Sequence, residues 1–113
     1  MAFIESNTVK AKNKAGGKGE ITIQHLLTPA ELDGKCGMFA KVTIPPGASI
    51  GVHPHNGTTE TYHLLQGEAL YNDNGVEKKI GAGATTFCPD GEIHGIENIG
   101  QDDLIFMALI IMK

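Results

Sequence analysis

The sequence predicts an all-β domain, and three observations support this class. Several segments, such as 20–27 and 36–44, alternate apolar and polar residues with the two-residue period of a β-strand. Turn signals stand between the segments, among them Pro45-Pro46-Gly47, Asn74-Gly75 and Pro89-Asp90-Gly91. Fifteen glycines and five prolines fit a chain with many turns, and only one short segment has helix signals. Short strands with turns between them are typical of a sandwich or a barrel, and 113 residues fit a single domain.

The N-terminal third is expected to contain an arm, a strand and one helical turn. Residues 1–19 form the arm, where lysines alternate with small and polar residues and glycines follow, so we predict a solvated or loosely docked segment. In the strand 20–27, one face carries Ile21, Ile23, His25 and Leu27. Thr28, Pro29 and Glu31 supply a cap, a first-turn proline and a capping box, which predict a single helical turn.

The later elements are all expected to be strands. The segment 36–44 presents Met38, Ala40, Val42 and Ile44 on one face. The segments 70–73 and 76–80 flank Asn74-Gly75, which predicts a tight hairpin. Residues 102–112 form the final strand, whose apolar run is continuous from Leu104.

Two histidines and a glutamate indicate a metal site in the middle of the chain. His53 and His55 are separated by one residue, so a strand places both rings on one face. Asn56-Gly57 follows and predicts a hairpin, with His55 opposite Thr58 for a two-residue loop or opposite Glu60 for a four-residue loop. Both registers put Glu60 on the histidine face, because directly opposed residues share a face. Two imidazoles and one carboxylate are suitable ligands for a divalent metal.

A second stretch adds His94, which follows a turn at the head of another predicted strand. Together the two stretches match two spaced motifs. The pattern G-x5-H-x-H-x4-E-x6-G falls on Gly47, His53, His55, Glu60 and Gly67. The pattern G-x5-P-x-G-x2-H-x3-N falls on Gly83, Pro89, Gly91, His94 and Asn98. With these motifs the chain resembles the cupins, and residues 16–112 are loosely similar to small single-domain cupins of the oxalate-decarboxylase-like group.

The resemblance implies a double-stranded β-helix, or jelly-roll barrel, over about residues 20–112, within a single cupin domain of residues 1–113. It also implies one divalent metal ion held by His53, His55, Glu60 and His94. Nitrogen and oxygen ligands favour Mn or Fe, although Zn, Ni, Co and Cu tolerate them. Four protein ligands leave two octahedral positions open, as catalytic metal sites do.

We therefore expect a metalloenzyme that acts on a small carboxylate or another oxygenated small molecule, of the decarboxylase, dioxygenase or isomerase type. The alternative is a non-catalytic small-molecule-binding or sensor cupin. Tyr62 continues the inward parity of Glu60, and His25 lies on an apolar face, so both are candidate substrate-binding residues. Because the sequence has no arginine and the predicted inward strand faces carry no lysine, we expect a substrate held mainly by the metal.

Charge and hydropathy restrict the partners. The formal net charge of −4 gives no electrostatic case for nucleic acid or an anionic membrane. The longest apolar run, 104–112, is too short for a membrane-spanning helix. With no signal peptide visible and only Cys36 and Cys88 present, we expect a cytoplasmic protein with buried, reduced thiols. Because the final strand is apolar on both faces, we expect a homodimer, with Leu65 and Phe39 extending its outer patch.

Overall fold

The computed structural model describes residues 3–113, and nearly all of its regular structure is strand. The elements are β1 Asn7–Lys12, η1 Lys14–Gly16, β2 Glu20–His25, α1 Pro29–Leu32, β3 Cys36–Ile44, β4 Ser49–Pro54, β5 Thr58–Gln66, β6 Glu68–Asp73, β7 Val76–Gly81, β8 Thr85–Cys88, β9 Ile93–Asn98 and β10 Leu104–Met112. The all-β prediction is confirmed.

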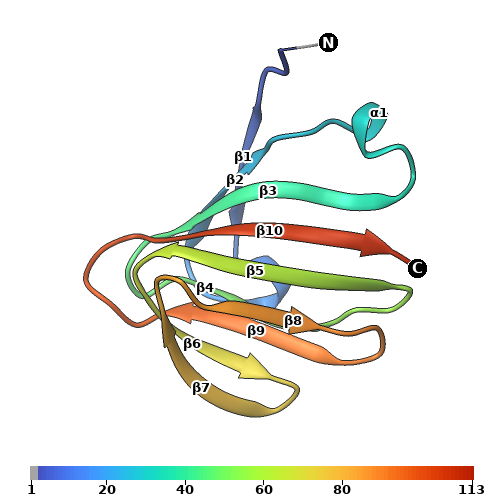
Figure 1. The fold of residues 1–113 in the computed structure, drawn as a ribbon. Helices are drawn as coiled ribbons and strands as arrows, with labels where there is room; N and C mark the ends of the chain where they lie inside the picture. The colour runs from blue at the N-terminus through green and yellow to red at the C-terminus, as the bar shows by residue number, and fades with distance from the viewer. Residues whose placement is uncertain (1–2) are drawn as a thin grey trace.

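The strands form two antiparallel sheets that enclose one interior (Figure 1). One sheet has six strands in the order β1-β2-β3-β10-β5-β8, and the other has four in the order β4-β9-β6-β7. Sequence neighbours such as β4 and β5 lie in different sheets, so the chain crosses between the sheets repeatedly. This arrangement is the predicted double-stranded β-helix.

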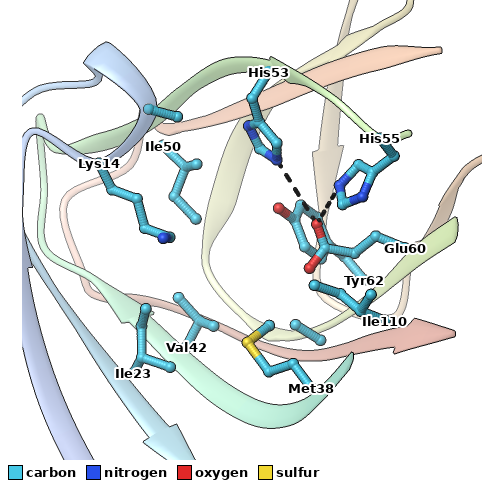
Figure 2. A pocket seen from close by; sticks show the side chains of 12 residues that line it. Lys14, Ile23, Met38, Val42, Ile50, His53, His55, Glu60, Tyr62 and Ile110 are labelled. Atoms are coloured by element: carbon cyan, nitrogen blue, oxygen red, sulfur yellow. Dashed lines mark hydrogen bonds and ion pairs between the residues drawn. The ribbon is translucent and has the colours of Figure 1, made fainter. Parts of the chain in front are cut away.

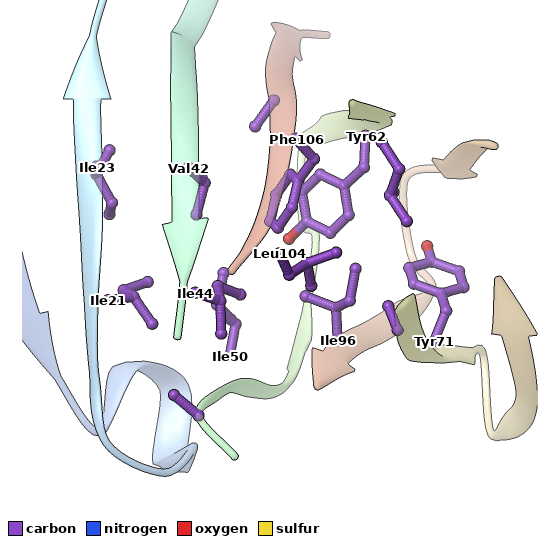
Figure 3. Packing of buried hydrophobic residues seen from close by; sticks show 14 of the residues in the cluster. Ile21, Ile23, Val42, Ile44, Ile50, Tyr62, Tyr71, Ile96, Leu104 and Phe106 are labelled. Atoms are coloured by element: carbon purple, nitrogen blue, oxygen red, sulfur yellow. The ribbon is translucent and has the colours of Figure 1, made fainter. Parts of the chain in front are cut away.

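A hydrophobic core fills the space between the sheets at one end of the barrel (Figure 3). β10 shows how the alternation builds it, because Leu104, Phe106 and Ala108 are buried while the residues between them are partly exposed. Ile44 and Leu64 from the flanking strands are also fully buried.

The predicted hairpin at Asn56-Gly57 is wrong. β4 pairs with β9, whereas β5 pairs with β10 and β8, so the strands on either side of the turn do not pair with each other. Gly57 has a φ of 75°, as a turn residue should, but the turn carries the chain from one sheet to the other. His53 and Glu60 therefore face each other across the barrel interior and not along a shared ladder.

The N-terminal arm is also more ordered than predicted. Residues 7–12 form β1, which pairs with β2 along its whole length, from Asn7 opposite His25 to Lys12 opposite Glu20. The η1 turn then packs against β4. The prediction of a loosely docked arm failed because the ladder partner, β2, decides the structure of a segment whose own pattern is mostly polar.

Two local predictions are confirmed. In the capping box before α1, the Thr28 backbone N–H donates to Glu31 Oε1 at 2.8 Å. Asn74 and Gly75 both have positive φ and join β6 to β7 in a tight hairpin. Cys36 and Cys88 are free thiols; Cys88 is buried as expected, whereas Cys36 is only partly buried. No helix within residues 3–113 is long and apolar enough to cross a membrane, and the cytoplasmic location remains a prediction.

Candidate metal centre

The four predicted metal ligands meet inside the barrel. His53 comes from β4, His55 from the residue after it, Glu60 from β5 and His94 from β9. His53 and His94 are directly opposed in the β4–β9 ladder, and Glu60 reaches them from the facing sheet. One ligand atom from each of the four lies within 4.8 Å of all the others. Figure 2 shows His53, His55 and Glu60 converging on one point.

The distances between the ligand atoms suit a metal ion. Glu60 Oε1 lies 3.0 Å from the Nε2 atoms of both His55 and His94, and those two Nε2 atoms are 3.1 Å apart. Two ligands at right angles, each about 2.1 Å from an ion, are separated by about 3.0 Å. His53 Nε2 is 3.8 Å from Glu60 Oε1, wider than this spacing and shorter than the roughly 4.2 Å of an opposed pair.

The outer nitrogen of each imidazole is held by an oxygen atom. His53 Nδ1 donates to the carbonyl of Gly51 at 2.7 Å, which fixes its tautomer because a carbonyl can only accept. His55 Nδ1 lies 2.9 Å from Thr58 Oγ1, and His94 Nδ1 lies 2.8 Å from the Tyr71 hydroxyl. Oxygen partners of this kind orient metal-binding histidines and point the Nε2 lone pairs inward.

In one tautomeric state this orientation favours a cation. When His55 and His94 both carry their proton on Nδ1, two lone pairs face each other across 3.1 Å beside a carboxylate. Such an arrangement is repulsive unless positive charge lies between the atoms. The donor set and its orientation therefore fit one divalent metal ion.

Electrostatics keeps the carboxylate charged. Burial alone would raise the pKa of Glu60, but the neighbouring rings of His53 and His94 lower that pKa to about 2. The same contact with Glu60 raises the pKa of His53, whereas burial lowers the pKa of His55. Glu60 is thus ionised near neutral pH and offers a negative charge to a cation.

Two tyrosines support His94, which is fully buried. The ring of Tyr62 stacks on the imidazole with 4.9 Å between centroids and 21° between planes. Tyr71, in β6, holds the outer nitrogen, and burial raises the pKa of this tyrosine to about 12. The sequence analysis missed this role of Tyr71; the only available signal was that a tyrosine on a buried face needs a partner for its hydroxyl.

A cavity of about 360 Å³ opens beside the ligands. Three ligands face it, while His94 lies behind them. Its lining is otherwise mostly apolar, and the complete set is Lys14, Ala15, Ile23, Met38, Val42, Ile50, His53, His55, Glu60, Tyr62, Ala108 and Ile110. Tyr62 thus lies where its parity predicted, although its substrate-binding role remains a prediction.

Two expectations about the cavity need correction. Lys14 lines it from η1 (Figure 2), so the cavity has a side-chain cation that the strand faces did not predict, and a substrate held mainly by the metal remains a prediction. The inward strand faces indeed lack lysine, but this lysine comes from the arm. His25 lines a different cavity, together with Leu27 and Leu32. It has the predicted parity but sits at the end of β2, so its neighbours come from the α1 region and not from the ligand strands.

The fold and the site together place this protein among small double-stranded β-helix proteins with a candidate metal site of three histidines and a glutamate. Residues 40–111 match the family model described as the Cupin domain, and the chain belongs to the cupin family. It is 44% identical to a Thermotoga maritima protein named oxalate-binding protein, over 91% of this chain and 85% of that one. It is 30% identical to an uncharacterized protein of Methanocaldococcus jannaschii, over 89% of this chain and 80% of that one.

The structural comparison agrees with the sequence comparison. The crystal structure of a predicted oxalate decarboxylase from Thermotoga maritima has a TM-score of 0.92 and 42% identity. The match covers 96% of this chain and 95% of that one. The barrel and its N-terminal strand are therefore both part of the similarity.

Proposed function

We propose that this protein is a metalloenzyme that acts on a small carboxylate bound to a divalent metal ion in the barrel. The observation that carries the proposal is the orientation of the four ligands toward one centre beside a cavity. Four protein ligands leave two octahedral positions for a small molecule. When bound, the metal would supply a Lewis acid to the oxygen atoms of the ligand.

The size of the cavity supports a ligand with few atoms. Its 360 Å³ lies at the low end of ligand pockets, which run from roughly 300 to 1,000 Å³. The name of the Thermotoga relative supports oxalate as the first ligand to test. Oxalate can bind a metal ion through the oxygen atoms of a carboxylate. For the metal itself, the nitrogen and oxygen donors support Mn or Fe before Zn, Ni, Co or Cu.

Decarboxylation is the reaction that this ligand suggests. One C–C bond of oxalate breaks, CO2 leaves, and the remaining carbon takes up one proton to give formate, so no external oxidant is consumed. Among the described residues that line the cavity without being metal ligands, Lys14 and Tyr62 carry transferable protons. Burial raises the pKa of Tyr62 well above its ordinary value, so its hydroxyl stays protonated.

The second candidate is a protein that binds the carboxylate without transforming it. One observation favours it: Glu60 is the only carboxylate among the described residues that line the cavity, and it is already used as a ligand. A bound carboxylate would then be held between the metal and an apolar wall with few groups to exchange protons.

One experiment tests the proposal and separates the candidates. Apo protein is loaded with Mn²⁺ and titrated with oxalate by calorimetry, and the same mixture is assayed for formate and CO2. Metal-dependent binding with stoichiometric formate and CO2 supports the enzyme. Metal-dependent binding without products supports the second candidate, and the absence of metal-dependent binding contradicts the assignment of oxalate.

The outer surface of the six-stranded sheet supports the expected homodimer, which we also propose. In β10, Ile105, Met107 and Leu109 point away from the core, and Leu65 of β5 is 49% exposed beside them. In the described part of the arm, β1 extends the sheet at β2. We expect sedimentation equilibrium to give twice the 12.0 kDa chain mass and Leu65→Lys to shift it toward monomer. A single species at the chain mass for the unmodified protein would contradict the dimer.

A further inference from the structure

The turn that carries Lys14 is fixed to the ligand strand β4. A Cβ atom at Gly17 would overlap the carbonyl oxygen of Ser49, and one at Gly51 would overlap that of Ala15. Both positions therefore require glycine for the two backbones to approach so closely. Gly51 also accepts the hydrogen bond of the ligand His53 at 2.7 Å, so the turn packs directly against the residues that orient the metal site.

Hydrogen bonds close the contact on both sides. The backbone N–H of Lys18 donates to Ser49 Oγ at 2.9 Å, and the N–H of Ser49 donates to the carbonyl of Lys18 at 2.9 Å. At the other end, the N–H of Asn13 donates to the carbonyl of Gly19 at 2.9 Å. The loop that contains η1 is thus tied at its base and along one edge.

The backbone on either side of Lys14 adopts an uncommon conformation. Asn13 has a φ of 50° and Ala15 has a φ of 53°, both in the left-handed region. Asparagine tolerates this region, but alanine does not favour it. Such conformations persist where the surrounding contacts impose them, and they gather at functional sites. Lys14 thereby lines the cavity (Figure 2), while the residue remains exposed to solvent.

The charges around the cavity favour an anionic ligand near Lys14. Apart from the imidazoles, Lys14 carries the only positive charge among the described lining residues, and Glu60 carries the only negative charge. A divalent ion on the four ligands would neutralise Glu60 and leave a net positive site. A ligand with two carboxylates could then place one on the metal and the other near the ammonium group of Lys14.

We propose that Lys14 is a specificity-determining residue that binds the second carboxylate of a small dicarboxylate ligand in the metal cavity. This inference rests on the proposed function, because it takes the ligand to be a carboxylate bound at the metal. The inference adds the class of ligand to the proposed function. A dicarboxylate has a second carboxylate that can pair with Lys14, whereas a monocarboxylate has none left once it is bound to the metal. Lys14 lines the cavity but is an exposed residue, so salt should weaken the gain.

The test compares two ligands and two lysines. Manganese-loaded wild type, Lys14→Gln and Lys12→Gln are titrated by calorimetry with oxalate and with oxamate, in which an amide replaces one carboxylate. Lys12 is the matched control because it is an exposed lysine of the same arm that does not line the cavity. We expect Lys14→Gln to weaken oxalate binding about five- to tenfold, consistent with one partly screened charge-assisted contact. Oxamate binding and Mn²⁺ affinity should change less than twofold, and Lys12→Gln should match the wild type.

The outcomes distinguish this inference from the proposed function. Equal oxalate affinity in wild type and Lys14→Gln, or an equal loss for oxamate, would overturn the role of Lys14. If oxalate does not bind the wild type, the assignment of oxalate fails, and the same comparison is made with malonate against acetate. A Lys14-dependent preference for malonate would then support the inference without oxalate, and the absence of binding by either dicarboxylate would overturn both.

Discussion

Replacing Tyr71 with Phe removes a single oxygen atom that holds the buried ligand His94. Tyr71 is 3% exposed and His94 is 0% exposed, so water cannot take the place of the missing hydroxyl. In the metal-bound state, Nε2 of His94 uses its lone pair on the ion, and Nδ1 must keep its proton. The variant therefore leaves a buried N–H donor without a partner.

The expected loss of metal affinity depends on how much more the missing hydroxyl costs the metal-bound state than the metal-free state. A buried unsatisfied donor costs about 1–3 kcal/mol, and each 1.4 kcal/mol is a factor of about ten. Without metal, the imidazole can move its proton to Nε2 and donate to Glu60 Oε1, which lies 3.0 Å away. Most of the cost then falls on the metal-bound state. We expect Tyr71→Phe to lower metal affinity roughly 10- to 100-fold, the range usual for partners of metal-binding histidines.

Competition against a chromophoric chelator, with Mn²⁺ and with Zn²⁺, measures the affinity. The matched control is Thr85→Val, which removes a hydroxyl from another histidine, His63, where Oγ1 and Nδ1 are 2.8 Å apart. That pair is exposed and remote from the ligands, so the control should keep wild-type affinity. An affinity within twofold of wild type for a folded Tyr71→Phe variant would refute the reasoning.

Three further predictions concern the fold, the arm and pH. Asn98→Ala removes three hydrogen bonds of 2.8 Å from a residue that is 2% exposed, and urea denaturation should show a loss of about 3 kcal/mol. Gly17→Ala should displace the η1 turn from β4 and weaken oxalate binding by the manganese-loaded protein, as Lys14→Gln does, in the same calorimetric titration. Lowering the pH through the raised pKa of His53 protonates one ligand while Glu60, with its pKa of about 2, stays charged. Metal content after dialysis should therefore fall as the pH is lowered through and below the ordinary histidine range, and full retention at pH 5 would contradict this order.

The sequence predicts the ligands well because their information is local. Strand parity accounts for His53 and His55 on one face, and the spacing of the two motifs gives the full set through the cupin resemblance. The predicted placement of Glu60 beside the histidines rests on a hairpin that does not form. The same local information misled the pairing at Asn56-Gly57, because a turn signal does not say whether the two strands share a sheet. The direct pairing of His53 with His94 depends on residues 41 positions apart, and no local pattern contains it.

The missed residues depend on non-local packing. Tyr71 reaches His94 only because β6 and β9 are adjacent, and Lys14 reaches the cavity only because the arm docks on β4. The docking requires glycine at positions 17 and 51, because a side chain at either would overlap the other backbone. From the sequence alone, these glycines indicate only a flexible backbone. For His25, strand parity correctly gives the face of β2 on which it lies. Parity does not give its position along the barrel, which places it away from the metal ligands.

The most direct test of the metal centre is the stoichiometry of metal binding. Apo protein is titrated with Mn²⁺ by calorimetry, and the loaded protein is analysed for bound metal by mass spectrometry, alongside His94→Ala checked for its fold by circular dichroism. We predict one ion per chain for the unmodified protein and strongly reduced metal content for the folded variant. Full occupancy of His94→Ala, or no binding by the unmodified protein, would contradict the assignment of His53, His55, Glu60 and His94 as the metal site.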